Sequence, residues 1–334
     1  MRIVFLGAGS VGCFVGGCWQ ACGLDVGFVG RKAIADEIAA HGLTLTDHTG
    51  WRRALPAETV GYGDEPAALA GADLVVVTVK STATIEAAGL IADHARPDAT
   101  VLSLQNGISN VDILRERLAG HEVIAGMVGF NVARLSPGHW HMGTGGEFIA
   151  ARAPITEKIA TASAGTPAAL TVSDDIKAVA WGKLLLNLNN AVNALSGLKL
   201  VDELSTRGYR RVLAASIAEA LAVLNAAGIA PAKLTALPPS LLSPFLNTPD
   251  WFFRAIGLRL QKIDANARSS MADDFAAGRL TEIDFLNGEI VRLAGRVGVP
   301  APVNARVVEL VKAAQTGGRR EWSAKDLVAE LGLG

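Results

Sequence analysis

The sequence predicts a two-domain α/β protein, in which residues 1–170 form a parallel sheet with helices on both faces and residues 171–334 form an all-helical domain. In the first part, short apolar runs alternate with segments of helical periodicity, which is typical of strands joined by crossover helices. After about residue 170, almost every segment has helical periodicity. A length of 334 residues also agrees with two domains.

The N-terminal domain is expected to begin with a buried strand at residues 2–6, an apolar run that ends at a glycine. Two alternating segments, 43–47 and 51–55, are separated by a His-Thr-Gly turn and predict a hairpin. The other expected strands cover residues 25–29, 72–79, 99–104 and 122–129. The expected helices cover residues 7–22, 32–40, 82–94 and 111–118.

The C-terminal domain follows a connecting stretch at residues 165–169. Ser173 or Asp174 is expected to cap its first helix. Pro238, Pro239 and Pro244 predict a loop between helices. The expected helices cover residues 174–196, 207–227, 250–276, 281–297 and 303–315.

Composition excludes several classes of protein. The chain is 50% hydrophobic with a net charge of −1, which excludes intrinsic disorder and gives no basic footprint for nucleic acid. Residues 3–24 carry no charge, but their glycines argue against a signal peptide or membrane anchor. The three cysteines lack a CxxC or histidine cluster, so neither disulfides nor a metal site is expected. We therefore expect a cytoplasmic protein.

A glycine motif follows the first strand and opens a helix. In this context a GxGxxG pattern predicts a Rossmann-type dinucleotide site, because the glycines allow a tight turn, a close backbone approach to pyrophosphate and close packing of helix on strand. The free N–H groups of the helix N-terminus would face the anion. The predicted cofactor loop comprises Gly7, Ala8, Gly9, Ser10, Val11 and Gly12.

The end of the second strand favours NADP over NAD. An NAD site usually places a carboxylate there, but this chain has Arg31 and Lys32, and Asp25 lies at the opposite end of the strand. A guanidinium can grip the 2′-phosphate with two hydrogen bonds. The alternative is a solvated arginine at a helix start.

Two further polar residues follow predicted strands. Lys80 directly follows the third strand of the expected parallel sheet, and Asn106 follows the next one, so both are expected at the ligand edge of the sheet. Either could line the cofactor or the substrate, and either could instead serve the structure alone.

The first helix of the second domain carries a polar stripe. At about 100° per residue, Lys183, Asn187 and Asn190 fall on one side of an otherwise apolar helix, with Asn193 at the margin. Burial lowers the pKa of a lysine, which suits proton donation near neutral pH. The alternative is a lysine that extends to solvent beside structural amides.

A second polar cluster lies near residue 282. Thr281 and Asp284 match a capping box, which leaves Glu282 in a first helical turn, free to point at Lys183 or a substrate hydroxyl. The alternative is a solvated first-turn acid. Ser269 and Ser270 lie one helix earlier.

Together these motifs resemble the ketopantoate reductase (2-dehydropantoate 2-reductase) family over nearly the whole chain. The matching features are the glycine motif, a basic residue after the second and third strands, an Asn-Gly pair, a Pro-Gly-x-x-His-x-Gly stretch, a Trp-x-Lys-Leu helix, a Ser-Ser-Met and a Thr-Glu-Ile-Asp-Phe-x-Asn-Gly signature. They lie at Gly7–Gly12, Arg31, Lys80, Asn106–Gly107, Pro137–Gly143, Trp181–Leu184, Ser269–Met271 and Thr281–Gly288.

The resemblance implies an NADPH-dependent reduction of a 2-oxo acid. Lys183 would be the general acid, and Glu282 would position it and the substrate. Asn106, Asn187, Asn190 and Ser270 would hold the substrate. Gly7, Gly9, Gly12, Arg31, Lys80 and Asn106 would hold the cofactor. One departure concerns substrate choice, because Ala191 stands where the family often has a second asparagine, and Asn190 or Asn193 could replace it.

Three functions are consistent with these residues: reduction of 2-dehydropantoate on the route to pantothenate and coenzyme A, the same chemistry on another small 2-oxo acid, and a non-catalytic NADPH-binding regulator. If the site is catalytic, it is expected in the cleft between the two domains. The sequence leaves the oligomeric state open, a homodimer included.

Overall fold

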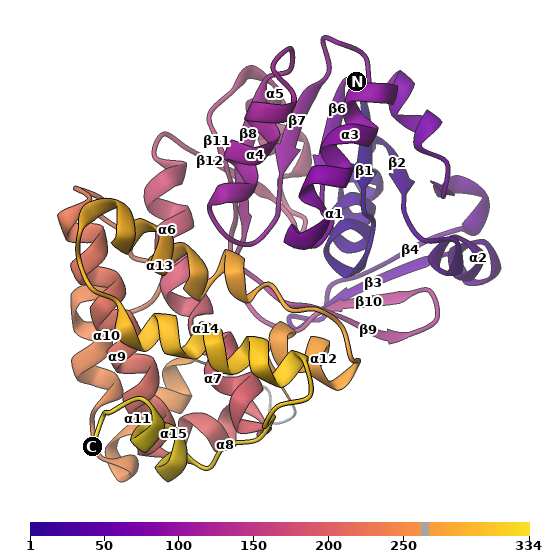
Figure 1. Cartoon of the computed structure of the whole chain (residues 1–334). Helices are drawn as coiled ribbons and strands as arrows, with labels where there is room; N and C mark the ends of the chain where they lie inside the picture. The colour runs from indigo at the N-terminus through magenta and orange to yellow at the C-terminus, as the bar shows by residue number, and fades with distance from the viewer. Residues whose placement is uncertain (262–266) are drawn as a thin grey trace. The chain divides into compact units, whose positions relative to one another are not determined.

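A computed structural model of the chain describes residues 1–261 and 267–334, with side-chain burial described outside residues 258–266. The chain divides into two compact units, Met1–Ile176 and Lys177–Gly334 (Figure 1). The expected fold class is confirmed, since the first unit contains two β-sheets with helices and the described part of the second unit is helical.

The main sheet of the first unit has eight strands in the order β12-β11-β8-β7-β6-β1-β2-β5. Six of them run parallel, the five expected strands and the unpredicted β5, but β11 is antiparallel to β8, and β12 is parallel to β11. A wholly parallel sheet was therefore a wrong prediction for this edge, where β9 (Val132–Ser136) and β10 (His139–Met142) replace a crossover helix between β8 and β11. The strands are β1 (Arg2–Leu6), β2 (Asp25–Val29), β5 (Gly61–Gly63), β6 (Leu74–Val77), β7 (Thr100–Ser103), β8 (Val123–Val128), β11 (Phe148–Ala151) and β12 (Leu170–Ser173).

Helices cover both faces of this sheet, as expected. Helices α1 (Ser10–Ala21) and α5 (Pro154–Ser163) share one apolar core with the strands, while α3 (Thr84–His94) and α4 (Ser109–Arg117) share the other. Alternating side chains of β1 supply both cores: Phe5 packs toward α1, and Val4 and Leu6 pack toward α3. The central strands β6 and β1, the latter after Arg2, are therefore apolar and buried on both sides.

A second sheet of four strands, in the order β4-β3-β10-β9, packs against α1. The predicted hairpin is confirmed as β3 (Leu43–Asp47) paired with β4 (Arg52–Leu55). Strands β9 (Val132–Ser136) and β10 (His139–Met142) were not predicted. Strand β10 has only four residues, of which Trp140 and Met142 are buried, so its alternating pattern is too short to indicate a strand. Helix α2 (Lys32–His41) agrees with the expected 32–40.

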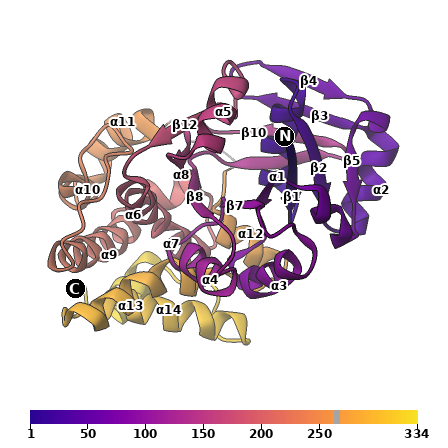
Figure 2. The same cartoon turned by 90° about the horizontal axis from the view of Figure 1, so that it is seen from above.

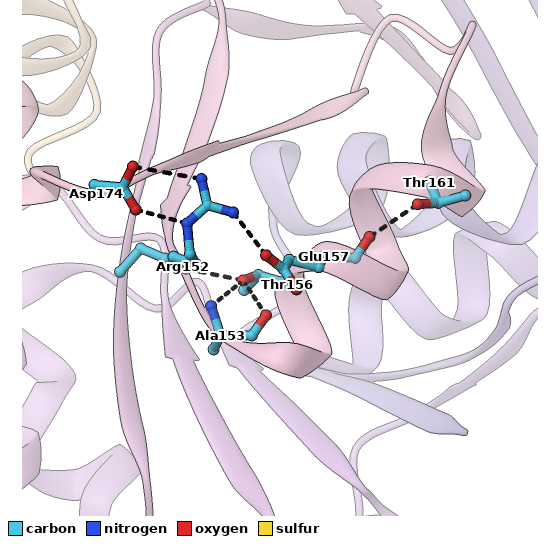
Figure 3. A network of polar contacts seen from close by, with 7 residues as sticks. Arg152, Ala153, Thr156, Glu157, Thr161 and Asp174 are labelled. Carbon is cyan, nitrogen blue, oxygen red and sulfur yellow. Dashed lines mark hydrogen bonds and ion pairs between the residues drawn. The ribbon is translucent and has the colours of Figure 1, made fainter.

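A polar network holds the far edge of the main sheet (Figure 3). The guanidinium of Arg152, next to the end of β11, donates to Asp174 Oδ1 and to Glu157 Oε1, both at 2.6 Å. Thr156 Oγ1 bonds the backbone around Ala153 and fixes the start of α5. These contacts tie β11, α5 and the segment after β12 together.

The second unit departs from the expected helix boundaries. The predicted helix 174–196 is interrupted at Leu188, which separates α6 (Ile176–Asn187) from α7 (Asn189–Ser196). One helix over 250–276 was wrong: α11 (Asp250–Gln261) and α12 (Ser270–Ala276) are separate helices, because Ser269 is an extended residue that caps α12. The part of that prediction at 262–266 lies outside the described residues.

The other corrections concern turns and short helices. Helix α13 (Asn287–Val297) begins six residues after Thr281 and follows the 3₁₀ turn η4 (Ile283–Phe285). The loop expected around Pro238, Pro239 and Pro244 was a wrong prediction, because residues 239–246 form helix α10 (Pro239–Leu246). A proline can begin a helix, since the N–H group that it lacks would have no partner in the first turn. Helices α8 (Leu200–Leu204) and α15 (Ala324–Glu330) were not predicted.

The long helices of the second unit form its core. Helix α9 (Arg207–Ala226) packs on α10, and α14 (Pro302–Gln315) lies beside α13 in the yellow part of Figure 2. Both long helices agree with the predicted segments 207–227 and 303–315. Within the described residues, no helix combines the length and apolar character that a membrane span needs.

Candidate active site

The register of the main sheet aligns four loops in the first unit. Leu6 pairs with Val29 of β2 and with Val77 of β6, and Val77 pairs with Ser103 of β7. The carboxyl ends of these strands therefore share one edge. Strand β2 lies on one side of β1, and β6, which comes later in the chain, lies on the other side. In open α/β sheets, a ligand crevice forms where the strand order reverses in this way.

Two of the three motif glycines are required by packing. Gly7 has a φ of +84°, and a Cβ there would lie 2.2 Å from Val79 Cγ1. Its N–H and that of Ala8 both donate to Val29 O, at 2.9 and 3.1 Å, so the loop is fixed on the end of β2. A Cβ on Gly12 would lie 2.7 Å from Thr78 Oγ1. The absence of a side chain at Gly12 therefore allows α1 to pack close to the end of β6.

The third glycine faces open space. A Cβ on Gly9 would meet only Gly7 O, at 3.8 Å. Gly9 is also the N-cap of α1, and no side chain of the described residues caps that helix. The N–H groups of the first turn are thus presented where an approaching backbone or anion finds room, as expected for a pyrophosphate.

The structure separates the two cations that follow β2. Both side chains are exposed, but Lys32 Nζ forms an ion pair with Asp36 at 2.8 Å, and this hydrogen bond raises the pKa of the ammonium. No residue of the described chain forms an ion pair with the guanidinium of Arg31. Arg31 therefore remains the better candidate for a phosphate.

Tyr62 supports the glycine loop and was missed in the sequence. Its hydroxyl donates to Ala8 O at 2.7 Å, and its ring stacks on Phe28 at a centroid distance of 5.9 Å. Burial raises the pKa of the phenol, which stays protonated. Its strand, β5, has three residues of which the first and last are glycines, and this pattern is too weak to predict a strand.

Lys80 and Asn106 lie in the loops after β6 and β7, as expected, each three residues beyond the end of its strand. Lys80 is exposed and precedes the 3₁₀ turn η3 (Ser81–Ala83), while Asn106 is partly buried. Ser81 Oγ donates to Asn106 O at 3.1 Å, so the two loops are joined. No sequence pattern indicated the buried side chains that connect the two loops.

Lys183 lies in the middle of α6 in the second unit. Burial lowers the pKa of its ammonium, as the sequence predicted, although the residue keeps some exposed surface. The preceding Gly182 allows a close backbone approach, since a Cβ there would lie 2.5 Å from Ala232 O. The Trp-x-Lys segment therefore packs directly against the backbone at Ala232.

The amides near Lys183 have different environments. Asn187 is buried at the end of α6, and Asn190 is partly exposed in α7, beyond the interruption at Leu188. Asn193 is fully buried: its amide donates to Leu198 O at 3.1 Å and accepts from Ser269 N at 2.9 Å. Asn193 thus connects α7 to the residue that caps α12. Asn190 is therefore the better candidate to replace the asparagine that the family often has at the position of the buried Ala191.

A buried acid behind this helix was also missed. Glu203 is fully buried, and Asn189 and Asn193 donate to its Oε2 at 3.1 and 3.3 Å. Burial raises the pKa of this carboxyl to about 8 despite these bonds. A single glutamate in a short helix gives no periodic signal, so only the fold identifies it.

The Ser-Ser-Met segment is attached to α7. Ser269 Oγ accepts from Ala272 N at 3.1 Å and lies 3.1 Å from Asn190 O, to which it donates. Ser270 is exposed at the first position of α12, whereas Met271 is buried. The structure thus brings the segments of Ser270 and Asn190 together.

The predicted capping box at Thr281 is wrong. Thr281 Oγ1 accepts from Gln315 Nε2 at 3.0 Å, and Asp284 forms an ion pair with Lys312 at 2.7 Å. Glu282 is only 5% exposed, so it is not a solvated first-turn acid. Its segment is bound to α14 through Thr281, and its pairing with Lys183 stays a prediction.

Two family profiles match the chain. One, described as "Ketopantoate reductase PanE/ApbA", matches residues 3–154, and its C-terminal counterpart matches residues 175–315. The 2-dehydropantoate 2-reductase of Caulobacter vibrioides is 31% identical over 75% of this chain and 80% of its own. That of Halobacterium salinarum is 29% identical over 95% and 100%.

A solved structure is similar in fold as well. The PanE/ApbA family ketopantoate reductase from Ralstonia eutropha has a TM-score of 0.80 and 30% identity, covering 95% of this chain and 99% of its own. The similarity thus extends over both units.

Proposed function

The chain belongs to the ketopantoate reductase PanE/ApbA family, and we propose that it reduces 2-dehydropantoate to pantoate with NADPH, on the route to pantothenate and coenzyme A. The observation that carries this proposal is the match of both units: residues 3–154 and 175–315 each match a ketopantoate reductase profile. The first unit would hold the cofactor and the second would supply the proton donor.

The residues at the sheet edge fit a dinucleotide phosphate. Among the described residues, no side chain caps the first turn of α1 and none forms an ion pair with Arg31, so the open space at Gly9 suits the pyrophosphate and the guanidinium suits the 2′-phosphate. Lys80 and Asn106 follow the neighbouring strands. When bound, NADPH supplies the hydride that reduces the carbonyl carbon.

Lys183 is proposed as the general acid. Reduction of a ketone leaves negative charge on oxygen, and a proton from Lys183 Nζ would neutralise it as it forms. The lowered pKa of this ammonium makes it a stronger acid than an exposed lysine. Asn187, Asn190 and Ser270 would bind the substrate, and Glu282 would hold both the substrate and Lys183.

A substrate panel tests this function. Purified protein would be assayed for loss of NADPH absorbance with 2-dehydropantoate and with other small branched or hydroxylated 2-oxo acids. The highest kcat/KM is expected for 2-dehydropantoate. A higher value for another acid would favour the second candidate substrate class, and NADPH binding without any turnover would favour a regulator.

Gly9→Ala tests the cofactor site without relying on turnover. Because a Cβ at this position meets only one atom, at 3.8 Å, the melting temperature should be nearly unchanged while the Kd for NADPH rises. Gly7→Ala is the matched comparison, since its φ of +84° and the contact at 2.2 Å should destabilise the fold itself. Unchanged NADPH affinity in Gly9→Ala would contradict the proposed cofactor site.

A further inference from the structure

The loops that carry Lys80 and Asn106 extend beyond the point where their strands are paired. The last ladder bond between β6 and β7 runs from Leu104 N to Val77 O at 3.0 Å. Past this bond, the backbone alone does not set how far apart the two loops lie. Both loops carry proposed ligand-binding residues, and one shared site requires a defined distance between them. Contacts other than backbone pairing must therefore set that distance.

Buried polar side chains continue the connection from strand to loop. Gln105 Nε2 donates to Val79 O at 3.2 Å, and Ser81 Oγ donates to Asn106 O at 3.1 Å. Each bond runs from a side chain of one loop to a backbone carbonyl of the other. The two loops are thus joined in both directions.

Asn110, in the first turn of α4, is the centre of this network. It is 1% exposed, and its Nδ2 donates to Asn106 O at 2.5 Å and to Ser81 Oγ at 2.9 Å. Its Oδ1 accepts from Thr84 Oγ1 at 2.7 Å. One amide therefore contacts the loop after β6, the loop after β7 and the start of α3.

The chemistry of the contacts requires an amide. Nδ2 faces two oxygens, a carbonyl and a hydroxyl that already donates its proton to Asn106 O, so only a group with two donors satisfies both. Oδ1 faces the Thr84 hydroxyl, which itself accepts from Gln105 Nε2 at 2.7 Å. A carboxylate or a methyl group at this position would offer neither donor, so the Ser81 hydroxyl oxygen would lose the bond that it accepts, and Asn106 O would keep the bond from Ser81 but lose the one from Asn110.

We propose that Asn110 is a positioning residue that fixes the spacing of Lys80 and Asn106, so that the two loops bind the cofactor as one preformed surface. This role rests on the proposed function, because it assigns Lys80 and Asn106 to the NADPH site. Preformed spacing matters since ordering two independent loops on binding would reduce the affinity.

Asn110→Ala is the main test, and NADPH itself is the probe. The Kd, measured by titration of NADPH fluorescence, should rise about tenfold or more, since several bonds are lost at once. The KM for NADPH should rise with it, whereas kcat at saturating NADPH should change less. In the protein without cofactor, amide exchange should accelerate at residues 79–84 and 105–110.

Thr156→Ala is the matched control for a merely structural role. Thr156 is also fully buried and bonds the backbone at Ala151 and Ala153, but it lies at the start of α5 (Figure 3). Its loss should lower the melting temperature without changing the Kd for NADPH. Equal Kd values in the two variants and the unmodified protein would overturn the positioning role.

Asn110→Asp keeps the shape of the side chain and carries the test if the alanine variant does not fold. Above neutral pH its carboxylate would oppose Asn106 O, and the Kd should rise. Burial among acceptors raises the pKa of such a carboxyl, so on acidification the protonated group can donate one bond and the Kd, relative to the unmodified protein, should recover in part. A pH-independent ratio would overturn the role. Failure of the unmodified protein to bind NADPH would instead overturn the proposed function.

Discussion

The two units build their candidate sites in different ways. In the first unit, every proposed cofactor residue follows the end of a strand whose register is fixed by backbone hydrogen bonds. In the second unit, the proposed catalytic residues lie on α6 and on the turn before η4, and the proposed substrate-binding residues lie on α6, α7 and α12. A site made from strand ends can be predicted from glycine spacing, whereas a site made from separate helices depends on tertiary packing.

The two units also differ in how they place charge. Arg31 and Lys80 of the first unit are exposed, as suits groups that meet a charged ligand from solvent. Burial in the second unit lowers the pKa of Lys183 and raises that of Glu203 to about 8. The first unit is therefore suited to binding anions, and the second to altering protonation.

Among the variants that test this difference between the units, Lys183→Ala is expected to have the largest effect on activity. Loss of a general acid should lower kcat by about 10²–10⁴-fold while the Kd for NADPH stays nearly the same. Lys177→Ala is the control, because Lys177 is an exposed lysine on the same helix. A melting temperature that falls while kcat per folded molecule stays within a few-fold would make Lys183 structural.

The lowered pKa of Lys183 has consequences for pH dependence. The unfolded ammonium titrates near 10.5, but the folded one loses its proton at lower pH, so kcat should fall on an alkaline limb that begins below 10.5. The cost of burying the charge is present in full below the folded pKa and disappears as pH rises toward 10.5. Lys183→Met should therefore gain most stability, relative to the unmodified protein, at neutral pH.

Chemical denaturation from pH 6 to 10 measures this difference in the free energy of unfolding. Each unit of pKa displacement corresponds to about 1.4 kcal/mol. A difference between Lys183→Met and the unmodified protein that does not narrow as pH rises would show that the ammonium is not penalised by burial.

Glu282→Gln should have the next largest effect. If the carboxylate holds both the substrate and Lys183, its loss should lower kcat and raise the KM for the 2-oxo acid, together by roughly 10–100-fold in kcat/KM. Asp284→Asn is the control two residues away, because Asp284 pairs with Lys312 at the surface. Equal kinetics in both variants would remove Glu282 from the site.

Arg31→Ala tests the charge of the first unit. It should erode the preference for NADPH over NADH by roughly tenfold and spare the use of NADH, because only the 2′-phosphate loses a partner. Lys32→Ala should have a much smaller effect, since Lys32 is already paired with Asp36. The comparison of kcat/KM for both cofactors decides this, and equal use of NADPH and NADH by the unmodified protein would contradict it.

The different construction of the units explains what the sequence could predict. Gly7 has a positive φ, and Gly12 packs α1 against the end of β6; every loop of this kind needs both glycines at this spacing, so the motif indicates the loop directly. Ser269 looked like the interior of a long helix, and only its contacts with Asn190 and Asn193 show why α12 starts there. Thr281 matched a capping box, but its bond to the distant Gln315 prevailed. Side-chain contacts between distant segments leave no periodic trace in sequence.

The smallest expected effect compares the two tyrosines of the chain. Tyr62 donates to Ala8 O at 2.7 Å in the first unit, and Tyr209 donates to Trp322 O at 2.8 Å in the second. Replacing either by phenylalanine removes one hydrogen bond to a carbonyl, which should lower stability by about 1 kcal/mol in both cases.

Only Tyr62→Phe should also weaken cofactor binding, because its hydroxyl braces the glycine loop. The expected rise in Kd is roughly two- to tenfold. It should be equal for NADPH and NADH, since the loop is proposed to bind the pyrophosphate that the two cofactors share, whereas Arg31→Ala should discriminate between them. Titration of both variants with both cofactors separates bracing of the loop from recognition of the phosphate. The same Kd in Tyr62→Phe and Tyr209→Phe would mean that the loop holds its shape without the tyrosine, through the bonds of Gly7 and Ala8 to Val29 O alone.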